Sequence, residues 1–352
     1  MQFAIAVPKG ALAASVGATL DVLTVASRCA RSLGKPALTW GVYSTQRQVA
    51  LSAGMTMPAQ PLEEMRNVAN AILVIPGIGL DHPELNTEAD IVDRFRDSNI
   101  WHRLLLADAH AFAKSARAHH DAGGAVAASC SGVLLLAQAG ILDSRTVTTH
   151  WRLGSFFQKY FPKVKVDTRQ MLVDDKNVIS AGAAMAQMDL MLYLIRKQAG
   201  REIADMAMKY FLIDCRPTQA RYRVWDHLRS DDDDVTSRFE TLIETSLPAV
   251  PSIAEAARLL NLTHRTLARR IVKATGASPQ ALIHTVRMRH AHRLLATGSL
   301  SLEEIAYRVG YANVSSLRKL TLKMEQTTPA SIKRSGRATD QRKPVSEITE
   351  CL

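Results

Sequence analysis

A cysteine and a histidine twenty residues apart are the first candidates for chemistry in this chain. Cys130 lies between a short apolar run and an apolar helix-like run, and His150 follows it in a Thr-Thr-His-Trp segment. A tight strand-to-helix turn presents its residue outward, and a helix N-terminus can lower the pKa of a thiol. Together the two side chains would be a nucleophile and its base. The simpler interpretation is a small core cysteine and a structural histidine, and spacing alone favours it.

A second group of residues has the chemistry to bind a polyanion. Two predicted helices, over residues 264–273 and 314–324, are apolar on one side only, and a longer helix over 279–296 joins them. Arginine can bind guanine edges, and hydroxyl side chains can contact bases or phosphates. The alternative is a solvated bundle with a basic surface, which two units of one design make less favourable. The candidate DNA-binding residues are His264, Arg265, Thr266, Arg269, Arg270, Asn313, Ser315, Ser316, Arg318 and Lys319.

The elements around these two helices repeat one pattern. Ser252 with Glu255 predicts a capping box at the start of a helix, and Ser301 with Glu304 predicts a second one. After each of these short helices comes a tight turn, and then the basic helix, the first of which is expected to end at Gly276. Helix, tight turn, helix is the helix-turn-helix pattern, and it occurs twice.

The charge distribution places the basic surplus in this part of the chain. The 352 residues carry a formal net charge of +11, and 47% of them are apolar, which excludes a mainly disordered chain. Residues 1–215 have a net charge of +3, whereas residues 237–343 have a net charge of +11. A polyanion is the natural partner of such a block.

The four cysteines show no paired spacing, which argues against a disulfide framework or a cysteine-rich zinc site, so we expect no metal and no cofactor. The sequence has no signal peptide pattern and no apolar run of about 18 residues. We therefore expect a cytoplasmic, nucleoid-associated bacterial protein.

Short apolar strands alternate with helices in the first part of the chain, which predicts a parallel sheet covered on both faces. The predicted strands are 3–7, 38–43, 71–75, 125–128, 147–149 and 178–180. The predicted helices are 16–30, 100–120, 132–139 and 187–198. We therefore expect an α/β three-layer sandwich over residues 1–198, a linker over 199–236, an all-α domain over 237–334 and a disordered tail over 335–352.

The helical block resembles the AraC/XylS DNA-binding domain over nearly its whole length. Gln326 and Leu317 depart from the family, which usually has a glycine and an aromatic residue there. The resemblance implies two recognition helices in successive major grooves, about 34 Å apart, and a role in activating or repressing transcription. The residues that carry it are Ala254, Ala257, Leu262, Thr263, Thr266, Leu267, Arg269, Arg270, Thr275, Gly276, Ser278, Pro279, Arg287, Arg289, Ala291, Arg293, Leu294, Leu295, Ile305, Ala306, Val309, Gly310, Tyr311, Thr328 and Pro329.

The first part of the chain resembles the ThiJ/PfpI, class I glutamine amidotransferase-like fold, which is flavodoxin-like, and residues 1–334 together resemble a GlxA-type transcriptional regulator. Enzymes of this superfamily carry a glutamate that contacts the cysteine of the strand-to-helix turn, called the elbow, which is Cys130 here. The alignment puts Ser15 at the position of that glutamate. A serine can form a hydrogen bond there but cannot titrate in that role. The residues that carry this resemblance are Ser15, Val16, Leu20, Asp21, Val22, Leu23, Ile75, Pro76, Gly77, Cys130, Ser131, Gly132, Leu136, Ala137, Ala139, Gly140, Leu142, Asp143, Thr148, Thr149, His150, Trp151, Val173, Asp174, Asp175, Ser180, Ala181 and Gly182.

The resemblance implies a transcriptional activator that binds double-stranded promoter DNA and contacts RNA polymerase. Its first domain would bind a small effector, such as an amine, an amide or an amino-acid derivative, or form a homodimer. Trp151 is expected to stack on a cationic ligand. Two alternatives stay open: a cysteine-dependent amidase or hydrolase using Cys130 and His150, and a redox sensor in which Cys130 is oxidised. The expected pocket residues are Ser15, Gly77, Cys130, Ser131, His150 and Trp151.

Overall fold

The structure is a computed structural model that describes residues 2–68, 70–80, 95–213, 234–275, 278–297, 300–325 and 328–333. The chain divides into two compact units, residues 1–223 and 224–352. Most of the expected linker, the expected helix end at Gly276, Gln326 and the expected tail lie outside the described residues. None of the helices in the described ranges is long and apolar enough to cross a membrane.

The first unit is built on a sheet of seven strands in the order β10-β11-β7-β6-β1-β2-β5. All neighbouring strands are parallel except β10 and β11, which form an antiparallel pair. The short pairs β3–β4 and β8–β9 lie outside this sheet. The strands are β1 (Phe3–Ala6), β2 (Trp40–Ser44), β3 (Gln48–Ala50), β4 (Thr56–Pro58), β5 (Gln60–Pro61), β6 (Ile72–Ile75), β7 (Val126–Ser129), β8 (Thr146–Val147), β9 (Lys165–Val166), β10 (Leu172–Asp175) and β11 (Val178–Ala181).

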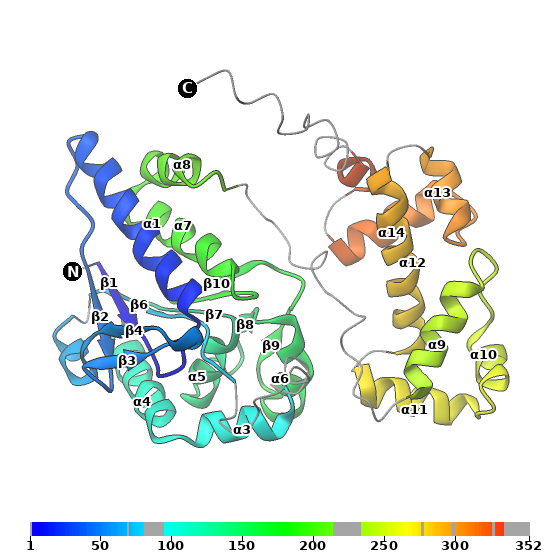
Figure 1. Cartoon of the computed structure of the whole chain (residues 1–352), viewed down its shortest axis with the longest axis horizontal. Helices are drawn as coiled ribbons and strands as arrows, with labels where there is room; N and C mark the ends of the chain where they lie inside the picture. The colour runs from blue at the N-terminus through cyan, green and yellow to red at the C-terminus, as the bar shows by residue number, and fades with distance from the viewer. Residues whose placement is uncertain are drawn as a thin grey trace. The chain divides into compact units, whose positions relative to one another are not determined.

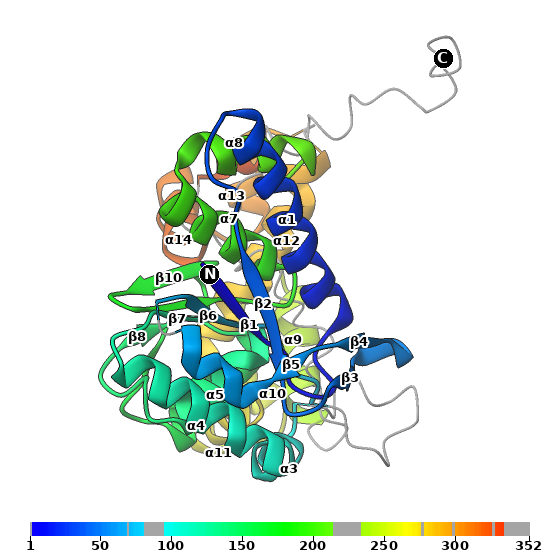
Figure 2. The same cartoon turned by 90° about the vertical axis from the view of Figure 1, so that its left-hand side faces the viewer.

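Helices cover both faces of this sheet, as Figures 1 and 2 show. One core joins the sheet to α1, α7 and α8, and a second core on the other face joins it to α3, α4, α5 and α6. The expected α/β three-layer sandwich is therefore confirmed. The helices are α1 (Ala13–Ser32), α3 (Asp97–Leu105), α4 (Ala107–Asp121), α5 (Val133–Gln138), α6 (Gly154–Tyr160), α7 (Ala186–Ala199) and α8 (Arg201–Tyr210).

The single helix expected over residues 100–120 is wrong, because Leu106 takes an extended conformation and separates α3 from α4. A buried ion pair stabilises this corner. Arg103 of α3 donates to both carboxylate oxygens of Asp108 in α4, at 3.0 and 3.1 Å, and to the carbonyl of Lys9 at 3.0 Å. The corner therefore depends on side chains rather than on a helix-breaking residue.

The start of the expected linker also needs correction. Residues 201–210 form α8, which buries Ile203, Ala204 and Ala207 in the core shared with α1 and α7. A face with three buried apolar residues stabilises a docked helix rather than a free connection. The first unit therefore includes α8.

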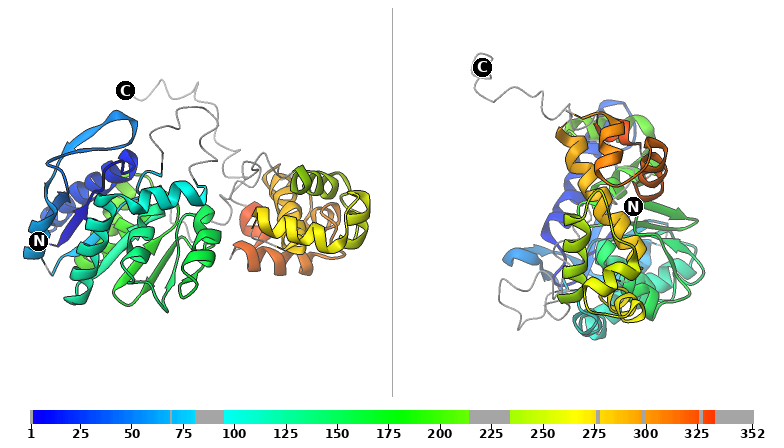
Figure 3. Two further views of the ribbon diagram at one scale, coloured as in Figure 1. Left: turned by 90° about the horizontal axis from the view of Figure 1, so that it is seen from below. Right: turned by 90° about the vertical axis from the view of Figure 1, so that its right-hand side faces the viewer.

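The regular secondary structure of the described residues in the second unit consists of helices joined by loops (Figure 3). Its first core contains residues of α9 to α12, and its second contains residues of α12 to α14, so α12 contributes to both. The helices are α9 (Asp234–Thr245), α10 (Ile253–Leu259), α11 (His264–Thr275), α12 (Pro279–Thr297), α13 (Leu302–Arg308) and α14 (Val314–Glu325).

Candidate DNA interface and elbow site

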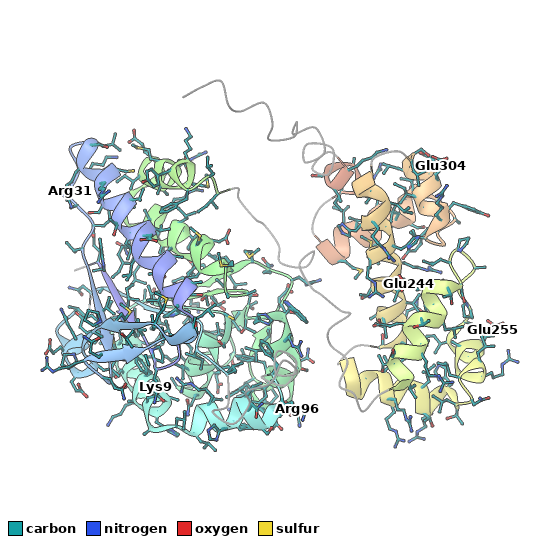
Figure 4. All side chains as sticks on the ribbon, viewed as in Figure 1. Lys9, Arg31, Arg96, Glu244, Glu255 and Glu304 are labelled. Carbon is teal, nitrogen blue, oxygen red and sulfur yellow. The ribbon has the colours of Figure 1, made fainter. Side chains whose placement is uncertain are left out.

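Both predicted capping boxes are present. The Ser252 hydroxyl accepts a hydrogen bond from the Glu255 amide, and the Glu255 carboxylate accepts one from the Ser252 amide, at 3.2 and 2.8 Å. Ser301 and Glu304 repeat the arrangement at the start of α13, at 3.2 and 2.7 Å. Figure 4 labels the two glutamates at these helix starts. Hydrogen bonds from the paired serine lower the pKa of each glutamate.

The helix pairs α10–α11 and α13–α14 are the two helix-turn-helix units. The second helix of each pair, α11 or α14, begins at a side-chain cap. The Thr263 hydroxyl accepts from the Thr266 amide at 3.1 Å, and the Asn313 side chain accepts from the Ser316 amide at 2.9 Å. Leu267 in α11 and Leu317 in α14 are fully buried against α12 and the preceding short helix. Each helix is therefore fixed by its first turn and by one apolar stripe, which leaves its other side to solvent.

Most of the predicted DNA-binding residues lie on that open side. Two of them, Thr266 and Ser316, are half-buried, and they and Asn313 form the caps that start the two helices. The exposed ones are His264, Arg265, Arg269 and Arg270 on α11, and Asn313, Ser315, Arg318 and Lys319 at the start of α14 or on it.

Within the helical unit, the turn between α13 and α14 contacts α12 and the loop before α10. Tyr311 lies in the turn between α13 and α14, and its hydroxyl is 3.2 Å from Nδ1 of His284. The Arg287 guanidinium carbon lies 4.9 Å from the centre of the Tyr311 ring. Gly310 has a φ of +80°, and a Cβ on it would lie 2.5 Å from the carbonyl oxygen of Pro248, in the loop before α10. The turn between α13 and α14 therefore packs against both α12 and the loop between α9 and α10.

Ion pairs join α9 to the same central helix. Glu240 lies 3.6 Å from Arg289, and Glu244, labelled in Figure 4, pairs with Arg293 one turn further along both helices. Glu240 and Phe239 are almost fully buried. Helix α9 begins at Asp234, inside the range 199–236 that the sequence predicts to be a linker, and no helix was expected at that start.

The elbow at the carboxyl end of β7 has the backbone that a strained turn requires. Cys130 is buried with a φ of +53°, in the left-handed region that a non-glycine residue rarely adopts. Its amide donates to the Gly182 carbonyl at 2.7 Å, and its carbonyl accepts from the Thr149 hydroxyl at 2.6 Å. A Cβ on Gly77 would lie 3.2 Å from the Cβ of Cys130. Three segments distant in sequence therefore hold the elbow in place.

Burial determines the chemistry of the Cys130 thiol. It raises the pKa of Cys130 to about 11, and hydrogen bonds from Ser131 offset only part of this effect. The Ser131 hydroxyl also donates to the carbonyl of Ile78 at 2.6 Å. At neutral pH the thiol therefore stays protonated rather than ionised.

The other two members of the expected constellation have partners elsewhere. The Ser15 hydroxyl donates to the carbonyl of Ala184 at 3.1 Å. Nδ1 of His150 accepts from the Arg152 amide at 3.2 Å, and burial, with the Arg152 charge, lowers the pKa of His150 to about 4. Within the described part of the chain, no hydrogen bond joins Cys130 to His150 or to Ser15.

His150 and Trp151 form part of a stack of rings that the sequence did not predict. The His150 ring lies 4.7 Å from the Phe95 ring and 5.2 Å from the Trp151 ring, with small interplanar angles. The Arg152 guanidinium lies 4.9 Å from the centre of the Phe95 ring and 5.8 Å from that of Trp151. The chain itself thus supplies a cation near Trp151, where we expected a ligand. No motif around Phe95 predicts this contact, because Phe95 is distant from His150 along the chain.

Comparisons with known proteins agree with this division. The profile of the DJ-1/PfpI family matches residues 104–197, and that of a helix-turn-helix domain matches residues 256–335. The HTH-type transcriptional regulator GbdR of Pseudomonas aeruginosa is 30% identical over 199 residues, which cover 56% of this chain and 54% of that protein. The regulator GlxA of Rhizobium meliloti is 26% identical over 207 residues, which cover 58% and 63%. The chain thus spans little more than half the length of the curated relatives it matches.

A solved structure of an AraC family transcriptional regulator from Pseudomonas putida aligns with a TM-score of 0.44 and 17% identity, over 60% of this chain and 100% of that one. The two profile matches lie in different parts of the chain, and both relatives named above are HTH-type transcriptional regulators. Residues 104–197 are therefore similar to the DJ-1/PfpI family and residues 256–335 to a helix-turn-helix domain, in the order that the sequence motifs predict.

Proposed function

We propose that this protein is a sequence-specific DNA-binding transcriptional regulator that acts as an activator in the bacterial cytoplasm. The observation that carries the proposal is the pair of helices α11 and α14, each fixed by a cap and a buried stripe and each exposing cations on its free side. Such a helix can lie in a major groove and contact base edges. The names of the relatives GbdR and GlxA support the same function.

In this proposal the first domain, which extends through α8, binds a small effector or forms a homodimer and does not catalyse a reaction. Its elbow thiol stays protonated at neutral pH, and the neutral His150 is hydrogen-bonded to Arg152 rather than to the thiol. An amine, an amide or an amino-acid derivative is the class of effector we propose for the residues around Cys130. Binding changes transcription only if the effector has different affinities for the active and inactive arrangements. RNA polymerase is the proposed partner on the promoter.

The second candidate function is a cysteine-dependent hydrolase. The strained backbone of Cys130 favours it, because residues held at positive φ cluster at functional sites. The protonated thiol and the serine at position 15 favour the first candidate.

Genome-wide occupancy of the tagged protein, followed by titration of the strongest site at two salt concentrations, tests the regulator proposal. We expect a few sharp promoter peaks with a motif of two half-sites. Arg269→Ala and Arg318→Ala should each weaken operator binding by about 1–3 kcal/mol and relax the base preference at one position. Arg201→Ala is the matched control, because this exposed arginine lies in the first unit. Diffuse binding that modest salt abolishes would contradict the proposal, since it reflects only counterion release.

A further inference from the structure

Each recognition helix exposes one aliphatic side chain at the same position. Val272 in α11 is 48% exposed and Leu322 in α14 is 46% exposed. Both stand nine residues after the capping residue of their helix, Thr263 or Asn313. Two exposed aliphatic residues at one position of a repeated unit indicate a shared role, whereas single ones scattered on a surface are ordinary.

The helical period places these residues on the side that is free to meet DNA. At 3.6 residues per turn, the second, sixth and ninth positions after the cap fall on one side of the helix. In α11 this stripe is Arg265, Arg269 and Val272, and the buried Leu267 and Ile271 lie on the other side.

In α14 the same stripe is Ser315, Lys319 and Leu322, and all but the aliphatic residue are polar. The stripe is about 10 Å long, because each residue adds about 1.5 Å along a helix. That length matches about three base pairs, which rise about 3.4 Å each. An aliphatic residue thus ends a row of side chains that are suited to contact bases or phosphates.

The chemistry of the major groove supplies one apolar group for such a residue. Valine and leucine cannot form hydrogen bonds, and the C5-methyl of thymine is the apolar group that the base edges present there. The cations beside each residue favour a polyanionic partner over an apolar protein surface. We propose that Val272 and Leu322 each contact a thymine methyl group at one end of a half-site and so determine base specificity. This inference rests on the proposed function.

Other exposed apolar residues in this domain lack the repetition. Leu259 in α10 is 61% exposed, and the equivalent position of the second unit, one residue before the buried Val309, is Arg308. Leu259 lies on the first helix of its unit and outside the stripe. Leu259→Ala is therefore a matched control, because it shortens an exposed aliphatic side chain in the same domain.

The test uses the full chain and the strongest operator found by occupancy. Each thymine is replaced in turn by deoxyuridine, which lacks only the methyl group, and Kd is measured at fixed salt for the wild type, Val272→Ala, Leu322→Ala and Leu259→Ala. We expect the wild type to lose about fourfold in affinity at one thymine of each half-site, the loss that one buried methyl-sized group predicts. Val272→Ala should abolish the loss in one half-site and Leu322→Ala in the other, and Leu259→Ala should keep both.

Three results would overturn the inference. The first is that deoxyuridine leaves Kd unchanged at every position of a specifically bound operator. The second is that the loss of affinity on removing the methyl group stays the same in both alanine variants. The third is unchanged DNA binding in these variants with reduced transcription, which would assign the two residues to a protein partner. A full chain that binds the operator no better than a scrambled duplex would instead refute the proposed function, and the inference with it.

Discussion

Gly310 is a position in the helical unit at which a side chain should be strongly destabilising. Its φ of +80° lies in the region that L-residues avoid, and its hypothetical Cβ would lie 2.5 Å from the Pro248 carbonyl oxygen and 3.2 Å from the Arg287 guanidinium. The left-handed conformation costs a non-glycine residue about 1–2 kcal/mol. The arginine can move aside, but the Pro248 carbonyl belongs to the backbone of the loop between α9 and α10. We therefore expect Gly310→Ala to destabilise the helical unit by about 2–4 kcal/mol.

The matched control is Gly34→Ala, because Gly34 has a φ of +68° and no atom within 4 Å of its hypothetical Cβ. This substitution should cost only the backbone term, about 1–2 kcal/mol. Thermal unfolding with hydrogen exchange on peptides from each unit separates the two effects. For a unit of this size, the expected loss in Gly310→Ala corresponds to a Tm lower by about 10–20 °C. Exchange should rise in α13 and α14 and stay unchanged in the α/β unit. Equal destabilisation by the two substitutions would refute the argument that the Pro248 contact is rigid.

Three further predictions concern the α/β unit. Alkylation of Cys130 should be slow at pH 7 and rise about tenfold per pH unit towards pH 11, with Cys130→Ser as the blank, and an inflection below pH 8 would contradict the burial argument. The pKa of His150 is about 4 in the folded chain and 6.5 in the unfolded chain, so the unfolded chain binds more protons between these pH values. The stability that neutral His150 contributes is therefore complete above pH 6.5 and is lost as the pH falls from 6.5 to 4. Urea midpoints at pH 7 and 5 should therefore differ less in His150→Gln than in the wild type, and an equal difference would show that His150 is exposed to water. Asp108→Asn should destabilise the unit by about 3–5 kcal/mol in urea unfolding, since it leaves the buried Arg103 unpaired, and a loss below about 1 kcal/mol would mean that water reaches the pair.

The elements that could be predicted from the sequence are those with a local physical signal. The apolar runs that became β1, β6 and β7 are fully buried, and their lack of alternation matches strands covered on both faces. The capping boxes at Ser252 and Ser301 fixed two helix starts, because a hydroxyl and a carboxyl three residues apart satisfy free amide groups.

The features that could not be predicted depend on distant partners. The corner at Leu106 depends on the ion pair of Arg103 with Asp108. No glycine or proline lies at this corner to predict it from the sequence. The docking of α8 depends on its packing against α1 and α7, and an isoleucine with two alanines, Ile203, Ala204 and Ala207, is too weak an apolar pattern to predict it from the sequence. Phe95 joins the ring stack on His150 only because the fold brings the two segments together.

The geometry of the turn at Cys130 distinguishes catalysis from ligand binding, which the sequence alone could not do. A strained turn at a strand end suits both catalysis and binding, since it projects backbone groups into the space above the sheet. Catalysis by a thiol also needs a thiolate, and here burial opposes its formation while the candidate base is hydrogen-bonded to the backbone of Arg152. A protonated thiol, a neutral imidazole and a buried hydroxyl can still distinguish ligands by shape and hydrogen bonding, because a buried polar group left without a partner costs about 1–3 kcal/mol. The strained turn at Cys130 is therefore better suited to binding a ligand than to catalysis by its thiol.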